Sequence, residues 1–129
     1  VLPNNNIELD WMIPAPAQGA IMVVCNENDK YSCDAVSKLN HSESEICCKI
    51  ERDFLRTLEG GCTAPIGGYA QIKNNKILFE GIILTEDGKE KVEIYTTLEA
   101  ENIESLGKEL ALQAISKGAD RILKKLTPQ

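Results

Sequence analysis

The chain has 129 residues, enough for one domain with a modest core. Its 14 basic against 20 acidic residues give a net charge of −6, which argues against nucleic acid or an anionic membrane as a partner. Five cysteines without a Cys-x-x-Cys pair predict reduced thiols rather than a disulfide framework or a zinc or other metal site. There is no initiator methionine and no apolar run long enough for a signal or a membrane span, so we expect a cytoplasmic protein.

Residues 1–40 are predicted to form two strands and a short helix. Apolar and polar residues alternate at 7–13, which is typical of a half-buried strand. Pro14-Ala15-Pro16-Ala17 then predicts an extended connector. A continuous apolar run predicts a second strand at 19–25, buried on both faces, and a helix is expected at 29–39.

The second of these strands needs a neighbour on each side. Packing on this chain's own domain is one possibility. Self-association is another, because a second copy would offer the same unpaired edge.

A stronger helix is predicted to begin at Ser42, where Ser42-x-x-Glu45 matches a capping box, and to end at Gly60-Gly61. Its apolar stripe comprises Ile46, Ile50, Phe54 and Leu58, widened by Cys47 and Leu55. The expected solvent side comprises Lys49, Glu51, Arg52, Asp53 and Arg56. His41, just before this helix, is more often a local hydrogen-bonding residue than a catalyst, and Cys47 and Cys48 are assigned to packing.

From Ile66 the period changes to two. Strands are predicted at 66–72, 76–84 and 91–96, joined by turns at Asn74-Asn75 and at 86–88. Gly81 within the middle strand indicates a bulge or a close backbone approach. Asn102 is expected to cap a last helical region that Gly118 interrupts.

These elements predict an α+β fold. A three-stranded antiparallel sheet is covered on one face by helices in a domain at 41–129. An extended segment at 1–40 precedes this domain.

The segment between the long helix and the first strand is unusual. Gly60 and Gly61 free the backbone for positive φ directly before Cys62, and Pro65 fixes φ three residues after it. A plain helix C-cap followed by a buried cysteine fits the same spacing. Spacing alone therefore leaves both a functional and a structural thiol open.

The run Leu58-Glu59-Gly60-Gly61-Cys62-x-x-Pro65-Ile66-Gly67 closely resembles the cofactor-attachment motif of porphobilinogen deaminase, also called hydroxymethylbilane synthase. Further matches in register are Pro14-Ala15-Pro16, Gln18-Gly19-Ala20-Ile21, Leu39-Asn40-His41, and Glu51-Arg52 with Phe54-Leu55. The resemblance covers roughly residues 9–88. It implies the C-terminal portion of a three-domain transferase of tetrapyrrole (porphyrin and heme) biosynthesis.

The resemblance also implies a covalent dipyrromethane cofactor on Cys62, with Gly60 and Gly61 beside it. On this primer the family polymerises four porphobilinogen units into hydroxymethylbilane, releasing ammonia, and the growing pyrrole chain is then a partner of the site. Gln18 and Gly19 would face the substrate cleft. The arginines and the catalytic aspartate would lie upstream of Val1, so no catalytic residue is expected in this chain, which alone would be inactive.

In the family, the segment at 1–40 crosses between domains and completes a sheet whose other strands lie upstream, and the full enzyme is a monomer. This chain departs from the family at Ala17, where a glycine is usual, and at Asn26, where an arginine is usual. The first change puts a positive φ in doubt, and the second removes a charge near the domain junction.

Local charge favours an anchor over a turnover nucleophile. Cys62 lies beyond the C-terminal end of a predicted helix, with Glu59 nearby and no base close in sequence, which disfavours a thiolate. A non-catalytic α+β binding or interaction module with a structural Cys62 is the alternative. A thiol-dependent hydrolase or redox protein is a third, which would need His41 or Cys25 close to Cys62.

Overall fold

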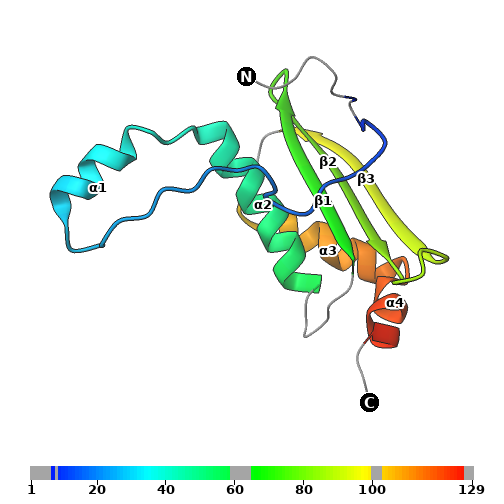
Figure 1. The fold of residues 1–129 in the computed structure, drawn as a ribbon. Helices are drawn as coiled ribbons and strands as arrows, with labels where there is room; N and C mark the ends of the chain where they lie inside the picture. The colour runs from blue at the N-terminus through cyan, green and yellow to red at the C-terminus, as the bar shows by residue number, and fades with distance from the viewer. Residues whose placement is uncertain (1–6, 8, 59–64, 100–102, 127–129) are drawn as a thin grey trace.

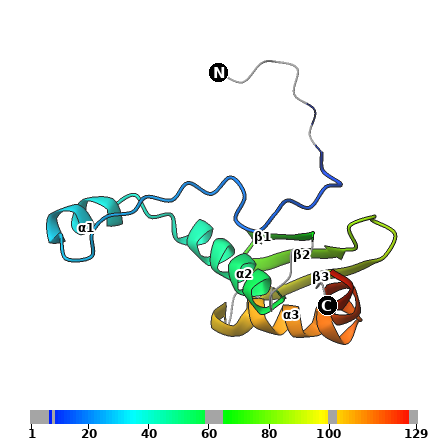
Figure 2. The same cartoon turned by 60° about the horizontal axis from the view of Figure 1, so that its bottom comes forward.

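The computed structural model describes residue 7 and residues 9–58, 65–99 and 103–126. A sheet lies on a layer of helices. The described residues before Ser42 form a long N-terminal arm, which crosses the edge of the sheet and carries a small helix away from this body (Figures 1 and 2). The arm bears α1 (Lys30–Ser37). The body comprises α2 (Ser42–Leu58), β1 (Ile66–Lys73), β2 (Lys76–Leu84), β3 (Lys91–Glu99), a 3-10 turn (Ile103–Ser105), α3 (Leu106–Ser116) and α4 (Ala119–Leu126). The predicted α+β fold with its three-stranded antiparallel sheet is confirmed.

The sheet has the order β1-β2-β3, with both pairs antiparallel. A two-residue turn joins β1 to β2, and its Asn74 and Asn75 have φ of 52° and 60°. Such left-handed conformations suit asparagine and match the twist of a hairpin. The predicted Asn-Asn turn is therefore confirmed, and it fixes the register of Lys73 opposite Lys76.

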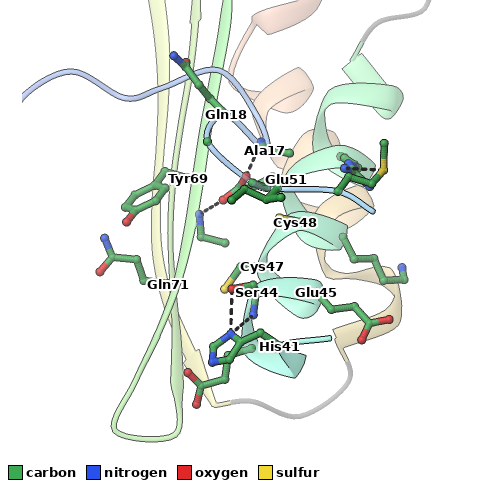
Figure 3. A pocket seen from close by; sticks show the side chains of 18 of the residues that line it. Ala17, Gln18, His41, Ser44, Glu45, Cys47, Cys48, Glu51, Tyr69 and Gln71 are labelled. Carbon is green, nitrogen blue, oxygen red and sulfur yellow. Dashed lines mark hydrogen bonds between the residues drawn. The ribbon is translucent and has the colours of Figure 1, made fainter. Parts of the chain in front are cut away.

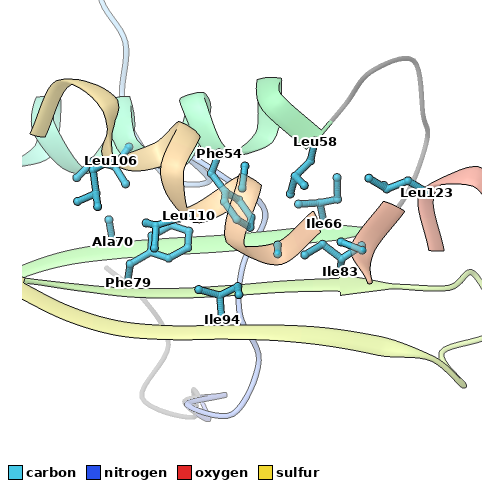
Figure 4. Packing of buried hydrophobic residues seen from close by; sticks show 14 of the residues in the cluster. Phe54, Leu58, Ile66, Ala70, Phe79, Ile83, Ile94, Leu106, Leu110 and Leu123 are labelled. Atoms are coloured by element: carbon cyan, nitrogen blue, oxygen red, sulfur yellow. The ribbon is translucent and has the colours of Figure 1, made fainter. Parts of the chain in front are cut away.

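One face of the sheet packs on the helices to form the core. Alternate residues of β2, namely Ile77, Phe79 and Ile83, are buried in this core. Figure 4 shows Phe79 and Ile83 among the side chains of the helices. The rings of Phe54 on α2 and Phe79 meet edge to face with centroids 4.9 Å apart. The remaining core side chains come mainly from α2, α3 and α4: Ile50, Leu58, Leu106, Leu110, Ala111, Ala114, Ala119, Ile122 and Leu123.

Gly81 lies at the centre of this packing. It pairs with Gly68 and with Ile94 in an uninterrupted register, so there is no bulge. A Cβ atom at position 81 would lie 2.9 Å from ring carbons of both Phe54 and Phe79. Of the two predicted alternatives, the close approach is the correct one.

The N-terminal arm differs from the prediction. Neither predicted strand forms among the described residues of 7–13 and 19–25, and Trp11 and Ile21 are 74% and 95% exposed. An alternating or apolar pattern becomes a strand only when a partner strand satisfies its backbone. Among the described residues, the arm accepts a backbone hydrogen bond from β1 at Pro14, which lies outside both predicted strands. The helix predicted at 29–39 forms as α1, with Asp29 as its N-cap accepting from the Ser32 N–H.

The start of α2 also differs from the predicted capping box. His41 rather than Ser42 is the cap, because its Nδ1 accepts from the Ser44 N–H at 3.3 Å and lies 2.9 Å from the Ser44 hydroxyl. The Glu45 carboxylate accepts from Asn40 Nδ2 instead of closing the box. The local structural role expected for His41 is confirmed.

The predicted cap at Asn102 lies outside the described residues. Among those that are described, no helix is both long and apolar enough to cross a bilayer.

Candidate functional site

The predicted cofactor residues Gly60, Gly61 and Cys62 lie at 59–64, outside the described residues. The structure does describe both ends of this segment. Leu58 closes α2 and Ile66 opens β1, and both side chains are part of the core (Figure 4). The Pro65 carbonyl accepts from the Leu84 N–H at 3.0 Å. The chain is therefore packed in the core on both sides of the segment that contains Cys62.

A second feature is a hollow of about 1040 Å³ between the N-terminal arm, α2 and the edge of β1 (Figure 3). We call it the arm hollow. The predicted cleft residues Gln18 and Gly19 border it, and so do His41, Cys47, Cys48 and Glu51. The structure thus brings Gln18 and Gly19 beside α2, the helix that leads to Cys62.

Glu51 is the polar centre of this junction (Figure 3). It is only 5% exposed, so its predicted place on the solvent side of α2 is wrong. Its Oε1 accepts from the Ala70 N–H of β1 at 2.8 Å, and its Oε2 accepts from the Ala17 N–H of the arm at 2.6 Å. One carboxylate thereby joins the sheet edge to the arm.

The sequence did contain a signal for this burial. Residues 47, 51 and 55 follow one another at intervals of four, and Cys47 and Leu55 both pack against the core. Position 51 is therefore on the same flank of α2. The prediction places Glu51 on the solvent side because glutamate is usually exposed, although the spacing indicates burial.

The arm turns sharply at the site. Ala17 has φ of 58°, so the positive φ that glycine would supply is retained by alanine, at a cost of roughly 1–2 kcal/mol. The Gln18 N–H donates to the Ala15 carbonyl, and the Ala20 N–H donates to the Ala17 carbonyl. The Gln18 side-chain oxygen accepts from the Ala15 N–H at 3.1 Å. This orients the exposed Gln18 amide on a compact turn.

The described thiols differ in their surroundings. Burial, followed by the charge of Glu51, raises the pKa of the half-buried Cys47 thiol, so it is held in its neutral form. Cys25 and Cys33, on the arm, have sulfurs 3.5 Å apart and are free thiols. Cys62 lies outside the described residues. The hydrolase or redox alternative, which needs His41 or Cys25 close to Cys62, therefore stays a prediction.

Glu51 makes stability depend on pH. Burial raises the pKa of its carboxyl, against an opposing effect of the N–H donors of Ala70 and Ala17. The stabilisation by the bound proton is complete below the pKa of the unfolded chain and is lost as pH rises through the folded pKa. We therefore expect wild type to gain stability relative to Glu51→Gln as pH falls from neutral toward the ordinary pKa of glutamate.

Urea unfolding of both chains at several pH values measures this difference. Glu43→Gln, on an exposed position of the same helix, controls for the loss of a carboxylate. Stability profiles of wild type and Glu51→Gln that stay parallel across the window would contradict the expectation.

Comparisons with known proteins agree with the resemblance noted in the sequence. The family described as "Porphobilinogen deaminase, C-terminal domain" matches residues 45–116. The porphobilinogen deaminase of Helicobacter hepaticus is 39% identical over 124 residues, covering 92% of this chain and 38% of that protein. Those of Staphylococcus aureus and Listeria innocua are 38% and 35% identical, covering 95% and 94% of this chain. The chain spans about two fifths of the length of these relatives.

Proposed function

Because the chain belongs to the porphobilinogen deaminase family, we propose that it is the cofactor-carrying, C-terminal portion of a transferase. This enzyme polymerises four porphobilinogen units into hydroxymethylbilane on a dipyrromethane primer, which is bound to Cys62 through a thioether. The observation that carries the proposal is the run Leu58-Glu59-Gly60-Gly61-Cys62, which follows directly from a helix anchored in the core.

The packing of Leu58 and Ile66, on either side of the segment that contains Cys62, suits a permanent tether. The Cys62 thiol would add to the exocyclic methylene carbon of a methylene-pyrrolenine. The S–C bond would form as the S–H bond and the exocyclic C=C π bond break, and the thiol proton would go to the ring nitrogen, which carries no proton in that species. The resulting thioether is resistant to water and to cellular thiols. Core packing at Leu58 and Ile66 would hold both ends of the segment while the attached chain lengthens. When bound, the dipyrromethane supplies the free pyrrole end to which each unit is added.

The donors beside the arm hollow fit an acidic pyrrole chain only in part. Gln18, Arg52 and Arg56 border the hollow, together with carboxylates such as Glu43 and Glu45. Acetate and propionate groups require several cations, preferably arginines. We propose that domains upstream of Val1 supply the rest, and that Gln18 and Gly19 contribute one wall of the cleft.

Mass spectrometry of the full-length enzyme, meaning the polypeptide that carries this chain behind its upstream domains, tests the proposal. We expect an adduct of two linked pyrroles on the peptide that contains Cys62, and an unmodified peptide around Cys47 as an internal control. An unmodified Cys62 would favour the alternative, a non-catalytic α+β interaction module. The isolated chain is expected to form no bilane from porphobilinogen.

A further inference from the structure

We propose that Glu51 is a positioning residue that fixes the Gln18 turn of the arm to the body carrying Cys62. The proposal deepens the function proposed above and rests on it. It concerns the relative placement of two parts of one site, the tether and the wall of the cleft, and it follows from four observations on the described residues.

The first observation is how the arm attaches to the body. The Gly68 N–H of β1 donates directly to the Pro14 carbonyl at 2.9 Å. The next outward N–H along the same edge, that of Ala70, is bonded to Glu51, which in turn accepts from Ala17. The arm thus follows the β1 edge as an incomplete fourth strand, and the Glu51 carboxylate replaces the missing direct bond.

The second observation is that the arm leaves the body immediately after this contact. Ile21 is 95% exposed, and Val24 is 78% exposed. Beyond the turn, Arg52 Nη2 of α2 lies 4.0 Å from Met22 Sδ of the arm, which is a long polar contact. Glu51 therefore acts at the point where the fixed part of the arm ends.

The third observation is the strained backbone at this point. Ala17 has a left-handed φ of 58°, and its N–H donates a hydrogen bond to the Glu51 carboxylate. A left-handed alanine persists only where surrounding contacts enforce it. The carboxylate is such a contact, and the turn it enforces orients the Gln18 amide.

The fourth observation links Glu51 to the tether. Glu51 lies two turns before the end of α2, and Ile50, Phe54 and Leu58 fix this half of the helix in the core. The residue after Leu58 begins the segment that contains Cys62. The same helix therefore sets the position of the Gln18 turn and of Leu58, the residue that precedes the tether segment.

Glu51→Gln in the full-length enzyme tests the proposal. The amide has one acceptor oxygen and directs an NH₂ group at the second donor. We expect Ala17 to be the N–H that loses its partner, because Ala70 is held in the sheet by its pairing with Phe79 and the arm can move away. We expect the two-pyrrole adduct on Cys62 to be retained while kcat/KM for porphobilinogen falls by about tenfold to a hundredfold, as for a misplaced substrate contact. We also expect amide exchange at Ala17 and Gln18 to rise by at least about tenfold, with exchange at Phe79 in β2 unchanged.

Two further variants make the result decisive. Glu51→Asp keeps the charge but is one methylene too short to reach both donors, so it should show a smaller loss and serves if Glu51→Gln does not fold. Glu86→Gln changes an exposed glutamate in the turn between β2 and β3, away from the residues that border the arm hollow, and should leave kcat/KM unchanged.

A merely structural Glu51 gives a different outcome. A lower melting temperature with unchanged kcat/KM per primed enzyme, or unchanged exchange at Ala17, would overturn the proposal. An unmodified Cys62 in the wild-type enzyme would instead overturn the proposed function, and the exchange measurement would still decide whether Glu51 fixes the turn.

Discussion

Gly107→Ala is expected to lower the free energy of unfolding by about 3 kcal/mol, a large loss for the addition of one methyl group. A Cβ atom at position 107 would lie 2.3 Å from the Ile50 carbonyl oxygen, 2.8 Å from the Asp53 Cβ and 3.0 Å from the Phe54 nitrogen. These are backbone or near-backbone atoms of α2, which cannot rotate away as a flexible side chain can. The first turn of α3 must therefore move away from α2, and core contacts are lost along both helices.

Chemical denaturation of the wild type and the variant measures this loss. Lys108→Ala, at the next, exposed position of α3, is the matched control and should change stability by less than about 0.5 kcal/mol. If Gly107→Ala unfolded at the same denaturant concentration as wild type, the close approach of α2 and α3 at this point would be wrong.

The sheet and α2 could be predicted from the sequence because their signals are local. Period-two alternation from Ile66 and the Asn74-Asn75 pair give the hairpin. The four-residue spacing from Ile46 to Leu58 gives the apolar face of α2, which runs from Ser42 to Leu58 as expected. In these elements, apart from the buried Glu51 of α2, residue preference and final environment agree.

The arm could not be predicted in the same way, because a strand is defined by its partner. The run at 19–25 has the composition of a buried strand, yet Ile21 is almost fully exposed in this chain. The closeness of α3 to α2 at Gly107 was equally hidden, since nothing near position 107 in the sequence names the backbone it meets. The periodicity of a sequence does not predict such tertiary contacts.

At the candidate site, the sequence predicts the motifs but not the hydrogen bonds that join them. Gln18 and Gly19 were singled out by resemblance, and the structure places them beside α2. The bond from Ala17 to Glu51 spans 34 positions, and it could not be inferred from either residue alone. A buried carboxylate is costly in free energy unless its oxygens accept hydrogen bonds. The burial of Glu51 therefore depends on its two N–H donors, which only the fold brings to it.

Cys62→Ala in the full-length enzyme is expected to reduce bilane formation from porphobilinogen to the limit of detection. Alanine has no nucleophile, so the primer has no atom to bind. The described thiols lie in other parts of the structure, because Cys47 and Cys48 are on α2 beside the arm hollow, and Cys25 lies on the arm next to Cys33. A coupled measurement of bilane formation and intact mass should show loss of both turnover and adduct.

Cys47→Ala is the matched control, because it removes a thiol beside the arm hollow and should leave the adduct on Cys62 in place. Equal thermal unfolding of wild type and Cys62→Ala is needed to separate chemistry from folding. Turnover by Cys62→Ala at a measurable rate would mean that the growing chain is held without this sulfur. In that case the polar walls of the cleft, Gln18 among them, would have to retain a polyanionic chain through every addition, a task for which the described residues offer too few cations.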